Sequence, residues 1–322
     1  MAPIQNSIPV IDIGPYISPT ASVLEQRKVV EVIRDACIQY GFFQLVGHGI
    51  PLGDQQQALS CAKMFFDLPV EEKVKLSMKN AMSECGRGYE AIGGQVLEEG
   101  KLPDAKEGIY IGEEVPPYNP RAGKFLQGPN MWPNLPENKY RIPIMAYRQK
   151  LLHLAETIMT ILALGLPYGP DVFNEFMKQP VANLKLLHYP PNESKSRLGA
   201  GSHTDFGCIT LLLQQPGSEG LEVLSPLTNT WIPIPSTADR YVVNVGDLLH
   251  RWTKGHYRST VHRVVDVGKT DRYSIPFFYH GNLATTISPL DGSVSLNAIT
   301  VEEHIRGKFR KSYKMDEKSQ DA

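Results

Sequence analysis

The 322-residue sequence lacks the features that mark membrane, secreted and nucleic-acid-binding proteins. Its longest apolar run, at residues 158–166, is far shorter than the roughly 18 residues of a membrane-spanning helix. The N-terminal segment has no basic region followed by an apolar one, so it does not resemble a secretion signal. No basic block of five residues occurs, and 33 basic residues nearly balance 34 acidic ones. We therefore expect neither a nucleic-acid nor a membrane partner.

Cysteine is also scarce, with four residues and no Cys-x-x-Cys pair. The scattered positions of Cys37, Cys61, Cys85 and Cys208 favour reduced intracellular thiols over a disulfide framework. With 42% hydrophobic and 21% charged residues, the composition is that of an ordinary globular protein. We expect a soluble, cytoplasmic protein; its oligomeric state cannot be predicted from these features.

The first half of the chain has the apolar spacing of helices. Helices are predicted at 23–40, 54–66, 71–78 and 137–166, the last interrupted at Pro143. Residues 81–135 are rich in glycine and proline and have no sustained period, which is typical of a long insert that can act as a lid.

The second half changes to short apolar runs separated by turn residues. Strands are predicted at 184–189, 209–213, 221–224, 231–234, 241–245, 260–265 and 273–278, with a helix returning at 301–310. The pattern indicates an α+β chain with a mainly β core. Its expected parts are an N-terminal helical region with a lid-like insert (1–135), supporting helices (136–180), the catalytic core (181–290), and a C-terminal helix and tail (291–322).

A possible metal site lies in the β-rich half. His203 and Asp205 have the spacing that puts two side chains on one face of a strand, and His262 lies in a later predicted strand. A lone His-x-Asp pair is weak evidence. Two imidazoles and one carboxylate together, however, match the ligand set of non-haem Fe(II) oxygenases.

A basic residue and a hydroxyl follow on the next predicted strand. Arg272 and Ser274 share a face there and offer a guanidinium and a hydroxyl to a carboxylate. The order His-x-Asp, His, Arg-x-Ser, each on a predicted strand, is much more specific than any of its parts.

With these motifs the sequence resembles the Fe(II)- and 2-oxoglutarate-dependent dioxygenases of the isopenicillin-N-synthase-like group. The resemblance covers nearly the whole chain. It includes Ile-Pro-Val-Ile-Asp at 8–12, Tyr-Gly-Phe-Phe-Gln-Leu-Val-Gly-His-Gly-Ile-Pro at 40–51, Arg-Gly-Tyr at 87–89 and Val-Asn-Val-Gly-Asp at 243–247. The family fold is a double-stranded β-helix, or jelly roll, flanked by helices.

The resemblance implies roles for individual residues. His203, Asp205 and His262 would bind Fe(II), while Arg272 and Ser274 would bind the distal carboxylate of 2-oxoglutarate. Tyr189 matches a tyrosine that contacts this cosubstrate. Leu187 stands where plant members carry asparagine, which suggests a fungal-type branch. With O₂, such a site oxidises a substrate C–H bond and releases succinate and CO₂; hydroxylation, desaturation, cyclisation and ring expansion all stay open.

Two other functions are possible. One is an Fe(II)-dependent oxidase of the same fold that does not use 2-oxoglutarate, and the other is a non-catalytic small-molecule binding protein. Release of succinate on turnover would separate the expected dioxygenase from the oxidase, and a broken triad would be expected of the binding protein.

The substrate is predicted least well. A small molecule is expected, with a fungal secondary metabolite such as a polyketide as the first choice and a nucleobase as the second. Candidate substrate residues come from the insert and from the strand after Arg272; they are Arg87, Tyr89, Lys106, Tyr110, Phe277 and Tyr279. Structural roles are expected instead for His48, His188, Phe206 and Cys208.

Overall fold

The computed structural model describes residues 7–98, 100, 102–191, 198–265, 270–293 and 298–313. Its helices are α1 (Gly14–Ile17), α2 (Val23–Gln39), α3 (Leu52–Phe66), α4 (Val70–Lys75), the 3₁₀ turn η1 (Met78–Asn80), α5 (Arg141–Leu164), α6 (Asn174–Met177), α7 (Asp247–Trp252) and α8 (Val301–Tyr313). None of these helices, in the part of the chain so described, has the length and apolar character needed to cross a membrane.

The strands fall into two main sheets and a short pair. They are β1 (Val10–Asp12), β2 (Phe42–Val46), β3 (Gly88–Glu90), β4 (Glu107–Ile111), β5 (Val181–Tyr189), β6 (Ala200–His203), β7 (Ile209–Gln214), β8 (Leu221–Leu224), β9 (Trp231–Pro233), β10 (Tyr241–Val245), β11 (His262–Val264), β12 (Arg272–Gly281), β13 (Thr286–Ile287) and β14 (Ile299–Thr300). The large sheet has the order β1-β2-β10-β7-β12-β5-β4-β3 and the small one β6-β11-β8-β9. The predicted α+β, jelly-roll fold class is confirmed.

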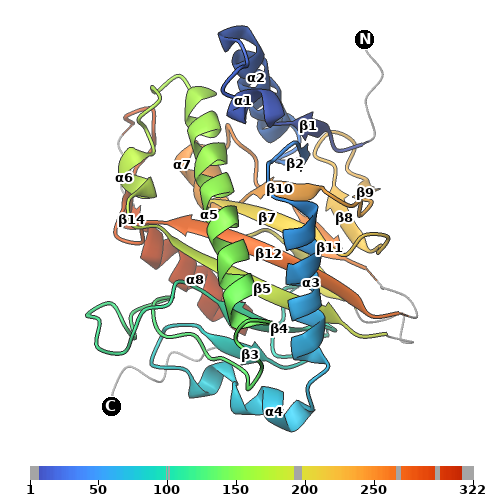
Figure 1. Ribbon diagram of the computed structural model, residues 1–322. Coiled ribbons are helices and arrows are strands. Elements are labelled where there is room, and N and C mark those ends of the chain that lie inside the picture. Colours follow the sequence, from blue (N-terminus) through green and yellow to red (C-terminus); the bar gives the residue numbers. More distant parts are fainter. Residues whose placement is uncertain are drawn as a thin grey trace.

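Helices cover one face of the large sheet. Figure 1 shows α3 and α5 crossing in front of it; α3 contacts its central strands β5 and β12, and α5 contacts β12. The apolar cluster on this face joins buried residues of these helices, such as Phe65 and Leu151, to Phe277 of β12. A second cluster joins Leu187 of the large sheet to Val223 and Val264 of the small one. In a jelly roll, a ligand can bind in the space between the two sheets.

Most predicted elements of the second half agree with the structure, and the helix interruption predicted at Pro143 was wrong. Pro143 does not interrupt α5, because it is the third residue of the helix, where a backbone N–H has no partner inside the helix to lose. Helix α2 does end where it was predicted to end. The residue after its C-cap, Gly41, has a φ of +66°, and a Cβ there would lie 2.2 Å from the carbonyl oxygen of Arg258.

The N-terminal part of the chain is less purely helical than predicted. It supplies four strands of the large sheet: β1 and β2 at one edge, β3 and β4 at the other. The last two lie inside the predicted lid-like insert, and β4 pairs with β5 so that Tyr110 lies opposite Lys185. These strands escape a periodicity search because β1 and β3 have three residues each and β4 begins Glu-Gly. They are stabilised by distant partners that the local sequence does not reveal.

Candidate metal centre and active site

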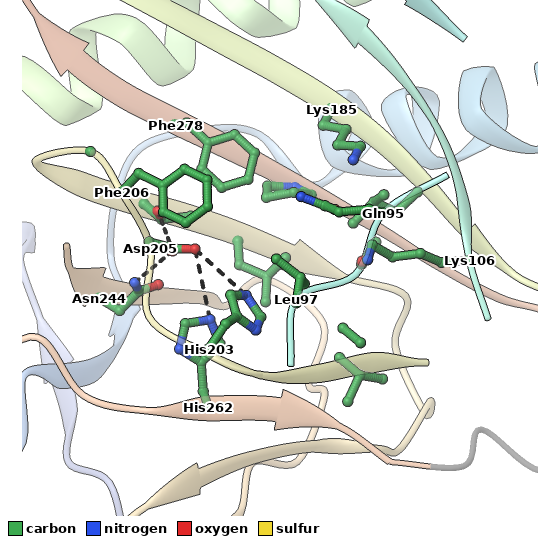
Figure 2. Close-up of a pocket in the computed structure, with 18 of the residues that line it drawn as sticks. Gln95, Leu97, Lys106, Lys185, His203, Asp205, Phe206, Asn244, His262 and Phe278 are labelled. Carbon is green, nitrogen blue, oxygen red and sulfur yellow. Dashed lines mark hydrogen bonds and ion pairs between the residues drawn. The ribbon is translucent and has the colours of Figure 1, made fainter. Parts of the chain in front are cut away.

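Three potential metal ligands meet between the two sheets. His203 ends β6 and His262 begins β11, and the two lie directly opposite each other in the antiparallel ladder, with ring centroids 4.3 Å apart. Asp205 lies two residues beyond His203, in the turn that leads to β7 rather than on the strand itself. The Nε2 atoms of both histidines are 3.8 Å from Oδ1 of Asp205 (Figure 2).

Backbone hydrogen bonds orient both imidazoles. Nδ1 of His203 is 2.7 Å from the carbonyl oxygen of Gly201, and Nδ1 of His262 is 3.2 Å from that of Thr260. A carbonyl only accepts, so each Nδ1 carries the proton and each Nε2 keeps a free lone pair directed at the centre. This is the arrangement that histidine ligands of a metal require.

Asp205 is held by two neighbours of the large sheet. Its Oδ2 accepts a hydrogen bond of 2.6 Å from Thr210 and one of 2.7 Å from Nδ2 of Asn244, which leaves Oδ1 for a cation. Burial by itself would raise the pKa of Asp205, but the two histidines and these hydrogen bonds outweigh it and hold the pKa below its usual range. The carboxylate is therefore ionised at neutral pH.

The donor set fits Fe(II). One ligand atom from each of the three residues lies within 4.8 Å of the others, and the donors are two imidazole nitrogens and one carboxylate oxygen. Burial, and next the neighbouring His262, lower the pKa of His203, which keeps this imidazole neutral. An Fe(II) ion held by these two nitrogens and one oxygen would keep further coordination positions for a cosubstrate and O₂.

A buried guanidinium lies at one end of the same space. Arg272 begins β12 and is 2% exposed; its Nη2 donates a hydrogen bond of 2.9 Å to Gln214, and the centroid of the Tyr189 ring lies 4.6 Å from its central carbon. Its Nε and Nη1 have no partner among the described residues. Unpaired buried donors of a cation are costly, and a carboxylate would satisfy both. The buried Ser274, two residues further on, offers a hydroxyl on the same face.

The triad and Arg272 border one cavity of about 120 Å³. Figure 2 shows the triad on one side of it, Phe206 and Phe278 above, and Lys185, Gln95 and Lys106 across the space. The remaining lining includes side chains from both sheets, a loop of the insert and helix α8; among them are Leu97, Tyr110, Asn183, Leu187, Tyr189, Leu212, Asn244, Ser274, His280 and Phe309.

Two of the predicted substrate residues line this cavity. Lys106 immediately precedes β4 and Tyr110 lies within it, and both border the space. The amine of Lys106 forms an ion pair with Asp104, and Nζ of Lys185 lies 4.3 Å from the ring centroid of Tyr110. Lys185 is also 2.7 Å from a carboxylate oxygen of Glu90. The cationic groups of this wall are thus balanced by buried acids.

Arg87 and Tyr89 do not line the cavity. The guanidinium of Arg87 is buried and bonds to the carbonyl oxygens of Cys85 and Leu126 and to Oδ1 of Asn183. The hydroxyl of Tyr89 donates a 2.5 Å hydrogen bond to Glu107. Tyr89 borders a second, outer cavity of about 760 Å³ instead, and Phe309 borders both cavities.

The proposed roles of Phe277 and Tyr279 need correction. Both are fully buried on the helix-covered face of β12, while the cavity is lined by Arg272, Ser274, Pro276, Phe278 and His280. Side chains alternate along a strand, so the face that carries Arg272 must also carry Phe278 and His280. This signal was present in the sequence, and the aromatic residues were assigned to the wrong face.

Of the four residues expected to have structural roles, three lie outside the cavity and one lines it. Nδ1 of His48 accepts a hydrogen bond from the backbone N–H of Ile50, and His188 of β5 lies between Glu107 and Asp271, outside the cavity. Cys208 is buried against Met159. Phe206, in contrast, lines the cavity beside Asp205.

Comparison with known protein families agrees with this site. Residues 8–135 match the model described as the N-terminal region of non-haem dioxygenases in morphine synthesis, and residues 180–281 match that of the 2OG-Fe(II) oxygenase superfamily. The second match contains the complete triad together with Arg272 and Ser274.

Individual proteins lead to the same family. A 2-oxoglutarate-dependent dioxygenase of Talaromyces stipitatus, tropC, is 46% identical over 309 residues, which are 94% of each chain. The clavatol oxidase of Penicillium crustosum is 39% identical over 95% of this chain and 96% of its own. The crystal structure of a full-length Neurospora crassa protein with alpha-KG and thymine superimposes with a TM-score of 0.81 at 26% identity, over 96% of this chain and 98% of that one. The chain belongs to the 2OG-Fe(II) oxygenase superfamily and is an Fe(II)- and 2-oxoglutarate-dependent dioxygenase that oxidises a C–H bond of a small molecule.

Proposed function

We propose that His203, Asp205 and His262 bind the iron, and that Arg272, Ser274 and Tyr189 bind 2-oxoglutarate. The observation that carries the proposal is the convergence of two oriented Nε2 atoms and Oδ1 of Asp205, with a half-satisfied buried guanidinium in the same cavity. Iron bound there would supply O₂ activation coupled to decarboxylation of 2-oxoglutarate.

The protein's own groups hold and orient the reactants. Arg272 donates to the distal carboxylate of 2-oxoglutarate, Ser274 adds a hydroxyl, and the Tyr189 ring keeps the guanidinium in place. Thr210 and Asn244 fix Oδ2 of Asp205, so that the ligand oxygen cannot rotate away. In the overall reaction one oxygen atom of O₂ enters succinate and the other enters the substrate when the outcome is hydroxylation.

The substrate is a compact ring compound of secondary metabolism in this proposal. The cavity is small, about 120 Å³, and Phe206, Phe278 and Phe309 supply aromatic walls. The related clavatol oxidase is named for a small molecule, and the Neurospora crassa structure contains thymine, which keeps a nucleobase as the second candidate.

The experiment that tests this function is turnover in the presence of clavatol or thymine, with Fe(II), 2-oxoglutarate and O₂ supplied or withheld one at a time. We expect succinate and oxidised product only when all three are present. Product formed without 2-oxoglutarate, and without succinate, would support the oxidase alternative instead.

We also propose that the enzyme works in the cytoplasm. All four cysteines are buried and unpaired, which suits a reducing compartment. Fractionation of the producing cells would test the location directly.

A further inference from the structure

Arg87 is a buried cation, and its burial costs folding free energy. Its side chain is 1% exposed, and it forms no ion pair with any carboxylate of the described residues. Burial lowers its pKa to about 10, so it is still charged at neutral pH. A buried cation without a counter-charge destabilises a fold unless its hydrogen bonds are fully used. The position therefore needs a reason beyond packing.

The surroundings accommodate the two Nη atoms of this guanidinium, whereas its Nε has no hydrogen-bond partner among the described residues. A Cβ at Gly112 would lie only 1.9 Å from Nη2 of Arg87, so only glycine leaves room for it there. Nη2 donates to the carbonyl oxygen of Leu126 at 2.8 Å, while Nη1 donates to that of Cys85 and to Oδ1 of Asn183, both at 3.0 Å. Two of these acceptors are backbone. The third is a side chain that belongs to the cavity.

The contact determines which way the amide of Asn183 points. A guanidinium can only donate hydrogen bonds, so the amide must turn its oxygen toward Arg87 and its NH₂ group away from it. Asn183 is 1% exposed and lines the cavity. Arg87 thus presents a hydrogen-bond donor to the cavity without lining the cavity itself.

The register of the sheet locates this donor at the substrate end. Asn183 pairs with Phe278, and Phe278 pairs with Thr210, which holds Asp205. Asn183 is thus at the level of the metal site and two strands away, about 10 Å from Thr210. Ser274, at the cosubstrate end, is four residues away from Phe278 along β12, or about 13 Å.

We propose that Arg87 is a positioning residue that orients Asn183, and that Nδ2 of Asn183 donates a hydrogen bond to a carbonyl or similar acceptor oxygen on the ring of the substrate. The ring would lie near Phe206 and Phe278, whose side chains stand above Asp205 in Figure 2. The inference rests on the proposed function and specifies its substrate: a small aromatic or heteroaromatic ring with an acceptor oxygen.

Two matched probes test the donor. 4-Hydroxyacetophenone has a carbonyl group where 4-ethylphenol has a methylene group and is otherwise the same. Their binding to the Mn(II)- and 2-oxoglutarate-loaded protein can be measured by calorimetry without O₂. We expect the ketone to bind the wild type about tenfold more tightly, as one well-placed hydrogen bond allows. Asn183→Asp keeps an acceptor for Arg87 but has no donor for the cavity, so this preference should disappear.

Arg148 provides a matched control. It is buried, burial lowers its pKa to about 10 as well, and its Nη2 donates to the carbonyl oxygen of Ala182, one residue before Asn183, but it does not line the cavity. We expect Arg87→Met to abolish the preference for the ketone because the amide is then free to turn. Arg148→Met should lower stability while leaving the preference near tenfold.

The proposal would be overturned by equal or undetectable binding of the two probes to the wild type, or by a preference that survives in Asn183→Asp. It would also be overturned if Arg148→Met removes the preference as completely as Arg87→Met. If Arg87→Met does not fold, Asn183→Asp decides the matter. Binding of 2-oxoglutarate to the Fe(II)-loaded wild type, measured by the charge-transfer absorption, distinguishes failure of the proposed function from failure of this inference. If 2-oxoglutarate does not bind, the proposed function is contradicted. If 2-oxoglutarate binds but the protein does not prefer the ketone, only this inference is contradicted.

Discussion

The two ends of the cavity are built in different ways. At the proposed cosubstrate end, Arg272, Tyr189 and Gln214 come from three adjacent strands of one sheet, with Arg272 directly opposite Tyr189. At the substrate end, the lining comes from β4, β5 and β12, the turn after His203, a loop of the insert and helix α8. Neighbouring strands give a rigid site for a constant cosubstrate, while separate segments can change one by one to suit a different substrate.

The largest effect is expected at the metal site, on which both ends depend. Asp205→Ala removes the only anionic ligand of the triad and should lower iron binding and turnover by at least about 10²-fold, since loss of an outer-shell partner alone costs roughly 10–100-fold. Iron content and succinate release are measured on protein shown to be folded by circular dichroism. Wild-type turnover in an iron-free Asp205→Ala protein would disprove the ligand assignment.

A large but selective effect is expected at the cosubstrate end. Arg272→Ala loses a charge-assisted hydrogen bond, so the concentration of 2-oxoglutarate at half-maximal rate should rise by at least about tenfold. Arg272→Lys keeps the charge but not the planar guanidinium, so its 2-oxoglutarate requirement should lie between those of the wild type and Arg272→Ala. Ser274→Ala should raise this requirement less than Arg272→Ala does. An unchanged requirement for 2-oxoglutarate in Arg272→Ala would show that its carboxylate binds elsewhere.

A smaller effect on product formation is expected from substitutions in β12, and it should differ between the two faces of this strand. Phe278→Leu alters the cavity wall, so the ratio of product to succinate should fall several-fold, given that displacing the target bond by about 1 Å can cost about 10²-fold in rate. Phe277→Leu, on the helix-covered face, should lower the stability by about 1 kcal/mol and leave the ratio unchanged. Denaturation curves and product analysis of both variants make the comparison. Equal ratios would mean that the substrate does not contact this wall.

The smallest effect on turnover is expected outside the cavity, where Glu107 bonds to Lys73, Tyr89 and His188. Burial alone would raise the pKa of Glu107, but these hydrogen bonds lower it below the ordinary 4.5. Because the folded pKa is the lower one, the stabilisation is complete above pH 4.5 and is lost as the pH falls through the folded value. Glu107→Gln should cost about 3 kcal/mol at neutral pH, because it breaks a buried ion pair.

Urea denaturation at neutral pH and below pH 4.5 tests this. The stability difference between wild type and Glu107→Gln should shrink at the lower pH, while turnover per folded molecule stays constant. A difference that is the same at both pH values would show that Glu107 does not act through its charge.

Local sequence patterns predicted much of this molecule. Helix α2 and strands β8 and β10 lie where apolar spacing and turn residues indicated, because each has a clear apolar pattern that turn residues delimit. Strands β1, β3 and β4 could not be found in this way, since they lack such a pattern and are stabilised by partners elsewhere in the sheet.

The site also has a part that the sequence predicts and a part that depends on distant segments coming together. The sequence by itself determined the oxygenase family, because the His-x-Asp, His and Arg-x-Ser motifs are short and lie on or beside strands whose alternation brings their side chains to one face. Only the tertiary structure decided the substrate end. Arg87 and Asn183 are 96 residues apart, and their contact depends on β4 lying between β3 and β5. The hydrogen bond between Arg87 and Asn183 leaves no periodic trace in the sequence, because long-range strand pairing creates its geometry.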